Sequence, residues 1–411
     1  FVAQADFGRA ELHVVELALH QLRLGVTQVI GYGALYYAFA VLAPEITRSA
    51  GWSSAWTYGA FSIGLFASGL VAPFSGRLID RHGAPTMMAL GSGLAGIAVT
   101  GLALSNTLPT FILAMVAVEV VSTLVLYDAA FTLLTQIAGK QARSAITRLT
   151  LIAGFASTIF WPLTVYLTGF MTWREVYLLY AALCIVVCMP IHWSMRRMIH
   201  RAAAREIGSE LSAATAASPL PPALARRAFW LIAVFFATGG FVVSVLSVHM
   251  LAILQSLGYA AGVATLIGMI QGPSQVAARA VEFVFARRLP PRSTAIVSAA
   301  LIPLGLGMLA FAALGPVAGV LFALSYGAGL GLNSIVRGTL PLSVFGAAGY
   351  GAMMGRLSAP GLVVKSAAPL AFALIEQHAG LTTALLVLGL VALVSLVAVI
   401  LVPRVAADHA A

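Results

Sequence analysis

Charged residues are scarce in this chain of 411 residues. Only 9% of the residues are Asp, Glu, Lys or Arg, whereas 61% are hydrophobic and the mean hydropathy is +0.99. A soluble domain with this composition would have to hide nearly all of its side chains from water. The composition therefore excludes a soluble globular protein and indicates a chain whose solvent is the lipid bilayer.

Cysteine is also rare, and the known nucleotide loops are missing. Cys184 and Cys188 are one helical turn apart on a single predicted helix, which is a poor arrangement for a structural disulfide. No His or Cys spacing indicates a zinc site. There is no Gly-x-x-x-x-Gly-Lys-Ser/Thr loop, and the glycine groups around Gly329 and Gly351 follow no predicted strand. We therefore expect no cofactor and no metal, and any driving force should be a gradient.

Apolar segments fill almost the whole sequence. A helix needs roughly 20 apolar residues to cross the hydrocarbon core. Segments such as Leu386–Leu401 do not alternate between apolar and polar residues, as the strands of a membrane β-barrel would. The sequence therefore predicts an all-α membrane protein with twelve spans at residues 24–46, 56–79, 86–105, 109–135, 148–171, 175–195, 228–255, 262–286, 294–314, 316–337, 348–375 and 380–403.

Basic residues fall in every second gap between these spans. The opposite gaps offer little beyond Arg48 and Arg174. By the positive-inside rule, both termini are then cytoplasmic, and we expect a multi-pass protein of the bacterial inner membrane. The basic gaps contain Arg77, Arg81, Lys140, Arg143, Arg196, Arg197, Arg201, Arg205, Arg226, Arg227, Arg287, Arg288, Arg292 and Arg404.

The formal net charge of +10 has the same explanation. The basic residues are scattered over loops that face the anionic inner leaflet, so the expected partner is the lipid bilayer and not nucleic acid. Near the N-terminus, Glu11, His13 and Glu16 interrupt any apolar core of a signal peptide. Residues 10–22 are more typical of a short amphipathic helix at the inner interface.

A polar, proline-containing stretch divides the chain in the middle. We predict an N-terminal interfacial segment at 1–21, a six-helix bundle at 22–195, a cytoplasmic linker at 196–227, a second six-helix bundle at 228–403 and a tail at 404–411. The two bundles echo each other at an offset of 207 residues. The matching pairs are Gly33 and Gly240, Gly51 and Gly258, Pro109 and Pro316, Gly139 and Gly346, Gly154 and Gly361, and Pro162 and Pro369. Duplicated halves are typical of secondary transporters.

The gap between the second and third spans carries a distinctive motif, Gly76-Arg77-Leu78-Ile79-Asp80-Arg81-His82-Gly83. It resembles the signature loop of the major facilitator superfamily, although Ala84 and Pro85 stand where a basic pair is common. Arg279 and Glu282 form a degenerate copy in the second half. The resemblance extends over the whole chain, and it implies two pseudo-symmetric six-helix bundles.

The chemistry of this loop predicts polar contacts with neighbouring helices, and the resemblance implies that they form a cytoplasmic gate. Asp80 can accept hydrogen bonds from backbone N–H groups at the start of a neighbouring helix. Arg77 or Arg81 can pair with Asp128, at the inner end of the fourth span. The resemblance implies a latch that holds the inner side closed. The alternative is a static salt bridge combined with positive-inside topology. The gate residues are Gly76, Arg77, Asp80, Arg81, Gly83, Asp128, Arg279 and Glu282.

Two opposite charges lie at similar depth in opposite halves. Glu119 is near the middle of the fourth span and Lys365 is near the middle of the eleventh. A charged group at that depth costs roughly 2.5–3.5 kcal/mol on insertion scales, so each needs a reason. The two can pair directly, Glu119 can carry a proton, or Lys365 can receive an anionic solute. Two separate structural ion pairs are the alternative.

Polar side chains recur at helical spacing on several other spans. Tyr32 and Tyr36 are one turn apart on the first span, and Tyr326, Asn333 and Arg337 share a face of the tenth. The resemblance implies that the first, fourth, seventh and tenth spans line a central cavity. Further candidates are Gln271 on the eighth span as a solute contact, and His249 on the seventh as a proton relay.

The sequence thus predicts a transporter and not an enzyme, since no cluster of catalytic groups at one depth is evident. We expect alternating access of a small organic anion, such as a carboxylate, coupled to protons and carried out by a monomer. The solute contacts would be Tyr32, Tyr36, Glu119, Tyr326, Asn333, Lys365 and Gln271, with Glu119 and His249 for the proton. The alternative is a proton-driven exporter of lipophilic or cationic compounds.

Overall fold

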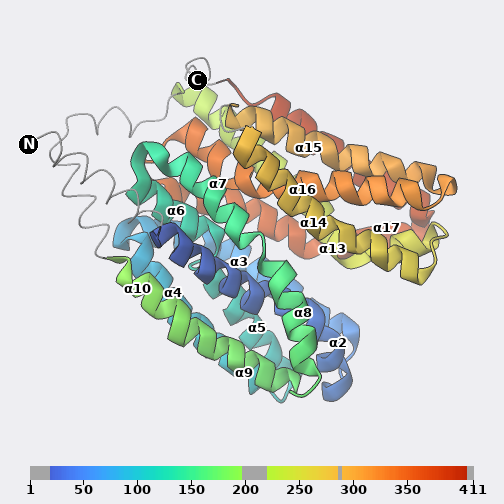
Figure 1. Ribbon diagram of the computed structural model, residues 1–411, viewed down its shortest axis with the longest axis horizontal. Helices are drawn as coiled ribbons and strands as arrows, with labels where there is room; N and C mark the ends of the chain where they lie inside the picture. The colour runs from blue at the N-terminus through green and yellow to red at the C-terminus, as the bar shows by residue number, and fades with distance from the viewer. Residues whose placement is uncertain (1–18, 197–219, 286–288, 405–411) are drawn as a thin grey trace, which may run out of the picture.

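The computed structural model describes residues 19–196, 220–285 and 289–404, and this part of the chain is almost entirely helical (Figure 1). The first helix, Leu19–Ala50, contains a π-helical turn, η1 (Gly33–Tyr37), followed by α2 (Ala38–Ala50). The rest of the first half comprises α3 (Ser54–His82), α4 (Ala84–Ala103), α5 (Leu108–Ser122), α6 (Tyr127–Ala138), η2 (Gly139–Gln141), α7 (Ala142–Ala153), α8 (Ala156–Thr168), α9 (Trp173–Leu183), η3 (Cys184–Cys188) and α10 (Met189–Ser194).

The second half has fewer but longer elements. They are α13 (Pro222–Ser256), α14 (Ala261–Phe285), α15 (Pro291–Met308), η4 (Leu309–Leu314), α16 (Pro316–Phe345) and α17 (Tyr350–Ile400). Helix α13 begins inside the range 196–227 that was predicted to be a linker, so Arg226 and Arg227 belong to its first turns. Residues 197–219, the interfacial segment up to residue 18 and the tail from 405 lie outside the described residues.

The twelve predicted spans are confirmed for the described residues. Ten helices are long and apolar enough to cross a membrane. Helix α14, which carries Arg279 and Glu282, is an eleventh of similar length. The 51 residues of α17 supply two spans, because Gly380 breaks the helix with a positive φ of 82°.

The spans form two bundles that converge at one end and spread apart at the other (Figure 1). We call the end that carries the turns at Gly83, Gly139 and Gly346 the closed end, and the opposite end, with the turns at Gly51 and Gly258, the open end. Gly51 and Gly258 both have a positive φ, as do Gly139 and Gly346. These are two of the pairs at the 207-residue offset, so the repeat in sequence is also a repeat of helix ends.

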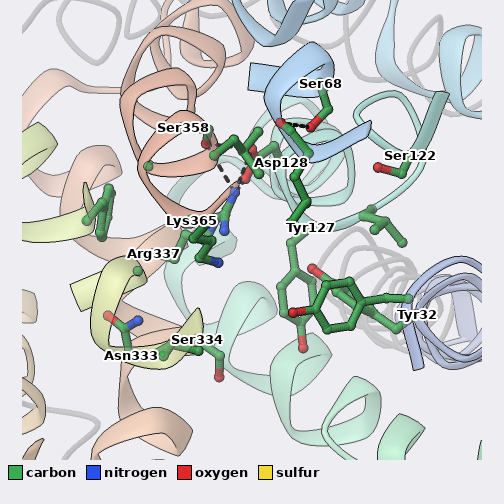
Figure 2. Close-up of a pocket in the computed structure, with 18 of the residues that line it drawn as sticks. Tyr32, Ser68, Ser122, Tyr127, Asp128, Asn333, Ser334, Arg337, Ser358 and Lys365 are labelled. Atoms are coloured by element: carbon green, nitrogen blue, oxygen red, sulfur yellow. Dashed lines mark hydrogen bonds and ion pairs between the residues drawn. The ribbon is translucent and has the colours of Figure 1, made fainter. Parts of the chain in front are cut away.

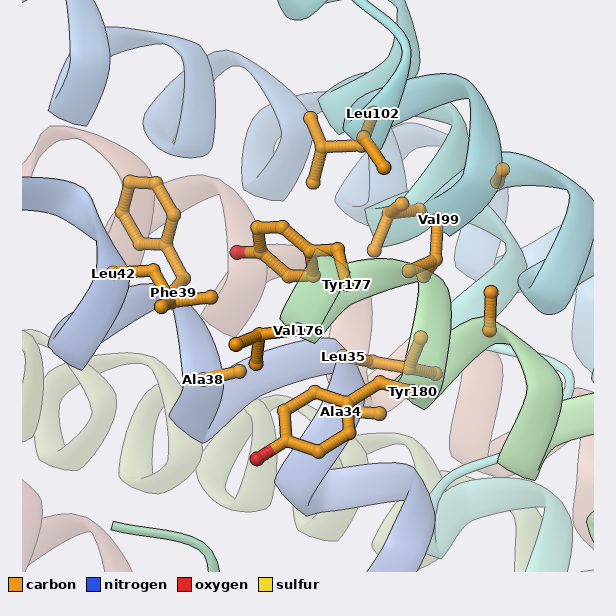
Figure 3. Close-up of a cluster of buried hydrophobic side chains, with 14 of the residues drawn as sticks. Ala34, Leu35, Ala38, Phe39, Leu42, Val99, Leu102, Val176, Tyr177 and Tyr180 are labelled. Atoms are coloured by element: carbon orange, nitrogen blue, oxygen red, sulfur yellow. The ribbon is translucent and has the colours of Figure 1, made fainter. Parts of the chain in front are cut away.

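Tyrosines of α9 anchor the core of the first bundle (Figure 3). Tyr177 and Tyr180 are buried against the first helix and α4. The hydroxyl of Tyr180 satisfies its hydrogen-bonding capacity with the Thr164 hydroxyl, 2.7 Å away on α8. This core joins the first helix to α4, α8 and α9 of its own bundle.

Helices α3 and α17 make the most extensive contact between the bundles. Gly76 lies directly against the backbone of Gly351, and Gly355 lies against the backbone of Ala72. Small residues allow helix backbones to approach this closely, and association within a membrane relies on such packing. Tyr350 and Met354 of α17 even belong to the core of the first bundle at the closed end.

We predict that Gly76→Ala destabilises the protein by about 1–3 kcal/mol, because the added methyl would meet the Gly351 backbone and force the helices apart. Gly59→Ala, on the same helix, is the matched control, since a Cβ at Gly59 would meet nothing within 4 Å. Thermal unfolding of both variants in detergent tests this. Equal melting temperatures for the two variants would show that the contact carries no stability.

Candidate functional site

A cavity of about 250 Å³ lies between the bundles, and both halves contribute to its walls. Cavities that hold drug-sized ligands measure roughly 300–1,000 Å³, so this one suits a smaller molecule. The walls come from the first helix, α3, α5, α6 and the α7–α8 junction on one side, and from α13, α14, α16 and α17 on the other. Ionisable and tyrosine side chains on these walls are Tyr32, Tyr36, Tyr37, Glu119, Tyr127, Asp128, Arg279, Arg337 and Lys365.

The π-helical turn η1 brings adjacent tyrosines to the cavity. The N–H of Ala38 donates to the carbonyl of Gly33, five residues earlier, which widens this turn. Tyr36 and Tyr37 both line the cavity, whereas the sequence spacing predicted only Tyr32 and Tyr36. Such turns are frequent at functional sites. The aromatic wall extends to Tyr127, whose ring lies 4.6 Å from that of Tyr32.

The fourth span is broken beside the cavity. Residues 123–126 interrupt it between α5 and α6, and Leu126 has an extended backbone. The break frees carbonyl groups that the bilayer cannot satisfy, and irregular backbone at this depth is tolerated where it lines a cavity. Gln28 meets this need, because its buried Nε2 donates to the Val125 carbonyl at 2.8 Å. The Nε2 of Gln28 is therefore occupied by the backbone, whereas its Oε1 is buried without a hydrogen-bond partner.

Asp128, in the first turn after this break, forms a bidentate ion pair with Arg337 of α16 (Figure 2). Nε of Arg337 donates to Oδ1 at 3.0 Å and Nη2 donates to Oδ2 at 2.9 Å. The Ser358 hydroxyl of α17 also donates to Oδ2, at 2.6 Å. The pair is mostly buried, with side-chain exposures of 29% for Arg337 and 22% for Asp128. It joins the two halves at the cavity wall.

This arrangement corrects the predicted partner of Asp128, because neither Arg77 nor Arg81 reaches it. Asp128 lies ten residues before the end of α6 at Ala138, well inside the span, whereas both arginines are exposed at the closed end. The guanidinium of Arg77 instead lies over the Phe74 ring, 4.6 Å from its centroid. Asp128 is in the first turn of α6 and not at the inner end of the span, where it was predicted to lie.

Asp80 accepts hydrogen bonds from a helix start, as its chemistry predicted. Its carboxylate accepts from the N–H of Gly351 at 3.0 Å and from that of Ala352 at 2.7 Å, at the beginning of α17. The partial positive charge of a helix N-terminus favours an anion there. Gly83, with φ of 84°, makes the turn into α4. In the second half, Glu282 is buried near the closed end in the field of Arg143.

Glu119 and Lys365 both line the cavity, but within the described residues no ion pair of 4.0 Å or less joins them. Oε1 of Glu119 is buried without a hydrogen-bond partner. Each charged side chain lies against a glycine of its own half. Gly64 of α3 leaves room for Glu119, and Gly240 of α13 leaves room for Lys365. Two opposite charges thus face one polar space without neutralising each other directly.

The backbone of Lys365 is held by a side chain of α13, because a proline follows one turn further along α17. Pro369 has no N–H, so the carbonyl of Lys365 loses its usual helical donor. The Ser244 hydroxyl of α13 donates to this carbonyl at 2.8 Å. Helix α13 therefore holds the backbone of Lys365 in position, while the Lys365 side chain extends to the cavity.

Arg279, which was predicted to belong to the gate, also lines the cavity. The residue is only 5% exposed, and its Nε donates to the Ser334 hydroxyl at 2.9 Å. Nη1 is buried without a partner and lies against Gly154 of the other bundle. A spacing of four residues from Gln271 through Gln275 to Arg279 could have revealed this polar face.

Three predicted site residues lie away from the cavity. Tyr326 is buried in the core of the second bundle, its ring stacked on Phe322. Gln271 is the second of them. Its backbone lies against Gly327, where α14 packs closely on α16. His249 hydrogen-bonds the Pro369 carbonyl through Nε2 at 3.1 Å. Asn333 does line the cavity, together with Ser334 and Ser358, which were not predicted.

We predict that Asp128→Ala destabilises the protein by about 1–3 kcal/mol, because it leaves the Arg337 charge unpaired at membrane depth. The double variant Asp128→Ala, Arg337→Ala should recover part of that loss, since it removes both charges. Unfolding free energies of the two single variants and the double variant give the coupling. Purely additive effects would contradict a stabilising ion pair between the halves.

Comparisons with known proteins agree with this architecture. The family model described as Major Facilitator Superfamily matches residues 24–361, more than half of the chain. A comparison with curated protein sequences gave no match. Among solved structures, the human organic anion transporter MFSD10 (TETRAN) has a TM-score of 0.66 at 15% identity, over 92% of this chain and 99% of that one.

Two further solved structures share the fold. The proton:xylose symporter XylE, bound to 6-bromo-6-deoxy-D-glucose, has a TM-score of 0.69 at 14% identity and covers 94% of this chain and 96% of its own. The transporter FucP in the outward conformation has a TM-score of 0.64 at 12% identity, over 93% and 98% of the two chains. At these identities the likeness establishes the fold alone.

Proposed function

Because the chain belongs to the Major Facilitator Superfamily, we propose that it is a secondary transporter that carries a small organic anion, a carboxylate, across the bacterial inner membrane by alternating access with proton coupling. The observation that carries the choice of an anion is Lys365, which lines the cavity without a carboxylate within ion-pair distance in the described part of the chain. A carboxylate solute would supply the missing negative charge.

The distribution of contacts supports alternating access. The bundles touch through α3 and α17 at the closed end, and the cavity lies beyond this contact. The basic residues Arg77, Arg81, Arg196 and Arg404 cluster at the closed end, which we therefore assign to the cytoplasm. The described state would then be open toward the outside, and the solute would leave inward after the closed end separates.

The gate in this proposal consists of contacts that must break for the closed end to separate. Asp80 releases the start of α17, Glu282 moves away from Arg143, and Asp128 parts from Arg337. Gly76, Arg77, Arg81 and Gly83 belong to the same loop region. Arg279 has a double role, because it lines the cavity and contacts Gly154 across the boundary between the halves.

We assign the proton to Glu119. Its surroundings include Tyr36 of the first helix, Tyr177 of α9 and Lys365 of α17, while α3 contributes Gly64 and no ionisable group. Protonation would remove the one unpaired negative charge from the cavity wall and so favour an anionic solute. We no longer assign a proton relay to His249, because the Pro369 carbonyl occupies its Nε2.

We predict that Lys365→Ala weakens binding of the carboxylate by roughly 10–100-fold and lowers its uptake accordingly, because a buried charge-assisted interaction contributes about 1.5–3 kcal/mol. Uptake of labelled carboxylates into proteoliposomes measures this. Arg356→Ala, an exposed position on the same helix, is the control that should leave uptake unchanged. Unchanged uptake by Lys365→Ala would refute the assignment.

We further predict that wild-type binding tightens as the pH is lowered over the range in which the protein stays folded, because a protonated Glu119 no longer repels the anion. Glu119→Gln mimics the protonated form, so it should bind tightly throughout this range and should not concentrate solute when a proton gradient is applied. Titration calorimetry and gradient-driven uptake test the two effects. A wild-type pH dependence that survives in Glu119→Gln would rule out Glu119 as the proton site.

The aromatic wall favours a second candidate, an exporter of lipophilic cations. Tyr32, Tyr36, Tyr37 and Tyr127 offer ring faces to a cation, and Glu119 offers a negative charge. Proton-driven efflux of a cationic dye that is lost in Glu119→Gln would support it. The small cavity and its surplus of cations favour the anion transporter.

A further inference from the structure

The cavity holds two cations without an acidic partner, and they lie on different helices. Asp128 neutralises Arg337, but no ion pair within the described residues involves Arg279 of α14 or Lys365 of α17. We propose that the solute is a small dicarboxylate, with one carboxylate on Lys365 and the other on Arg279. This inference rests on the proposed function, since it specifies the anion for the same site.

Neutral hydrogen-bond acceptors hold the guanidinium of Arg279 in place. Nε donates to the Gly331 carbonyl at 3.2 Å and to the Ser334 hydroxyl at 2.9 Å, and Nη2 donates to Gln275 Oε1 at 3.3 Å. These neutral acceptors fix the guanidinium plane without cancelling its charge. Arg279 lines the cavity, and its Nη1 is buried against Gly154 without a hydrogen-bond partner. A buried unpaired donor on a cation is costly unless a ligand completes it.

Lys365 is fixed by different neighbours. Ser244 holds its backbone carbonyl, and the aliphatic part of its side chain passes over Gly240 of α13. The ammonium group has no carboxylate within 4.0 Å among the described residues. Figure 2 shows Lys365 beside Arg337, whose own charge is taken by Asp128. The charge of Arg337 is therefore already neutralised, and Arg279 and Lys365 are the two cations that can bind the solute.

The two cations lie against different parts of the wall. Arg279 contacts Gly154, at the junction of α7 and α8, whereas Lys365 contacts Gly240 of α13. Because the two cations lie at different parts of the wall, we expect them to bind the two carboxylates of a short carbon chain more tightly than a compact dianion such as phosphate.

The charge balance requires two negative charges on the solute once Glu119 is protonated. Asp128 and Arg337 cancel, so the wall then retains the positive charges of Arg279 and Lys365 alone. A monocarboxylate would leave one buried cation uncompensated, which is unfavourable at low dielectric. A dicarboxylate compensates both.

Calorimetric titration of the purified full-length protein with matched acids tests the proposal. The probes are butanedioate against butanoate and pentanedioate against pentanoate, with inorganic phosphate and sulfate as compact dianions. We expect the dicarboxylates to bind at least about tenfold more tightly than the matching monocarboxylates, as one added charge-assisted contact implies. Equal affinities within the pairs, or tightest binding of phosphate or sulfate, would overturn the proposal.

Arg279→Gln identifies the second contact. We expect it to weaken dicarboxylate binding by at least about tenfold and to change monocarboxylate binding by less than about twofold, because the single carboxylate would use Lys365. Arg356→Gln on α17 is the control with no expected effect. If Arg279→Gln does not fold, Arg279→Lys keeps the charge and should retain a preference for dicarboxylates. Loss of that preference in a folded Arg279→Lys, or an equal loss for both acid classes in Arg279→Gln, would overturn the role of Arg279.

The outcomes distinguish the dicarboxylate proposal from the proposed function as an anion transporter. Binding of monocarboxylates and dicarboxylates with the same affinity, weakened in Lys365→Ala, would refute the dicarboxylate and leave the anion transporter intact. Absence of binding and uptake for every carboxylate would refute the proposed function itself.

Discussion

The bilayer offers no partner to a charged side chain or to a free backbone carbonyl, and this constraint orders the whole molecule. Where the fourth span breaks, Gln28 satisfies the exposed carbonyl of Val125. Where Pro369 removes a donor, Ser244 replaces it. Asp128 and Arg337 lie at membrane depth because they neutralise each other. Glu119, Arg279 and Lys365, which form no ion pair within the described residues, all line one cavity.

The contact between α3 and α17 explains how the bundles separate at one end while they touch at the other. Glycines on both helices bring the backbones together, and Asp80 holds the start of α17 through its backbone N–H groups. A few directional hydrogen bonds and a close glycine contact can form and break as a unit. The proposed change between two states would break these contacts and would also withdraw Tyr350 and Met354 of α17 from the apolar core of the first bundle.

The two halves repeat their helix ends but differ at the cavity. Gly51 and Gly258 make the same turn, as do Gly139 and Gly346. In contrast, the fourth span is broken at residues 123–126, whereas its counterpart α16 is continuous over 30 residues. Glu119 faces the cavity, while Tyr326, at the equivalent position, is packed in the core. The chemistry of the site therefore comes from the places where the duplicated halves have diverged.

The sequence by itself determined the twelve spans and the two halves, because hydropathy and glycine at turns are local properties. It predicted that Asp80 accepts from a helix start, but only the tertiary structure brought the start of α17, 271 residues away, to its carboxylate. The sequence also singled out Glu119 and Lys365, since charges stand out in an apolar segment. Only the tertiary structure decided that Arg337 pairs with Asp128 and that Arg279 lines the cavity. Such pairings depend on the depth and rotation of helices far apart in the chain. Close packing at glycines and the break in the fourth span set these quantities, and neither is visible in the periodicity of one helix.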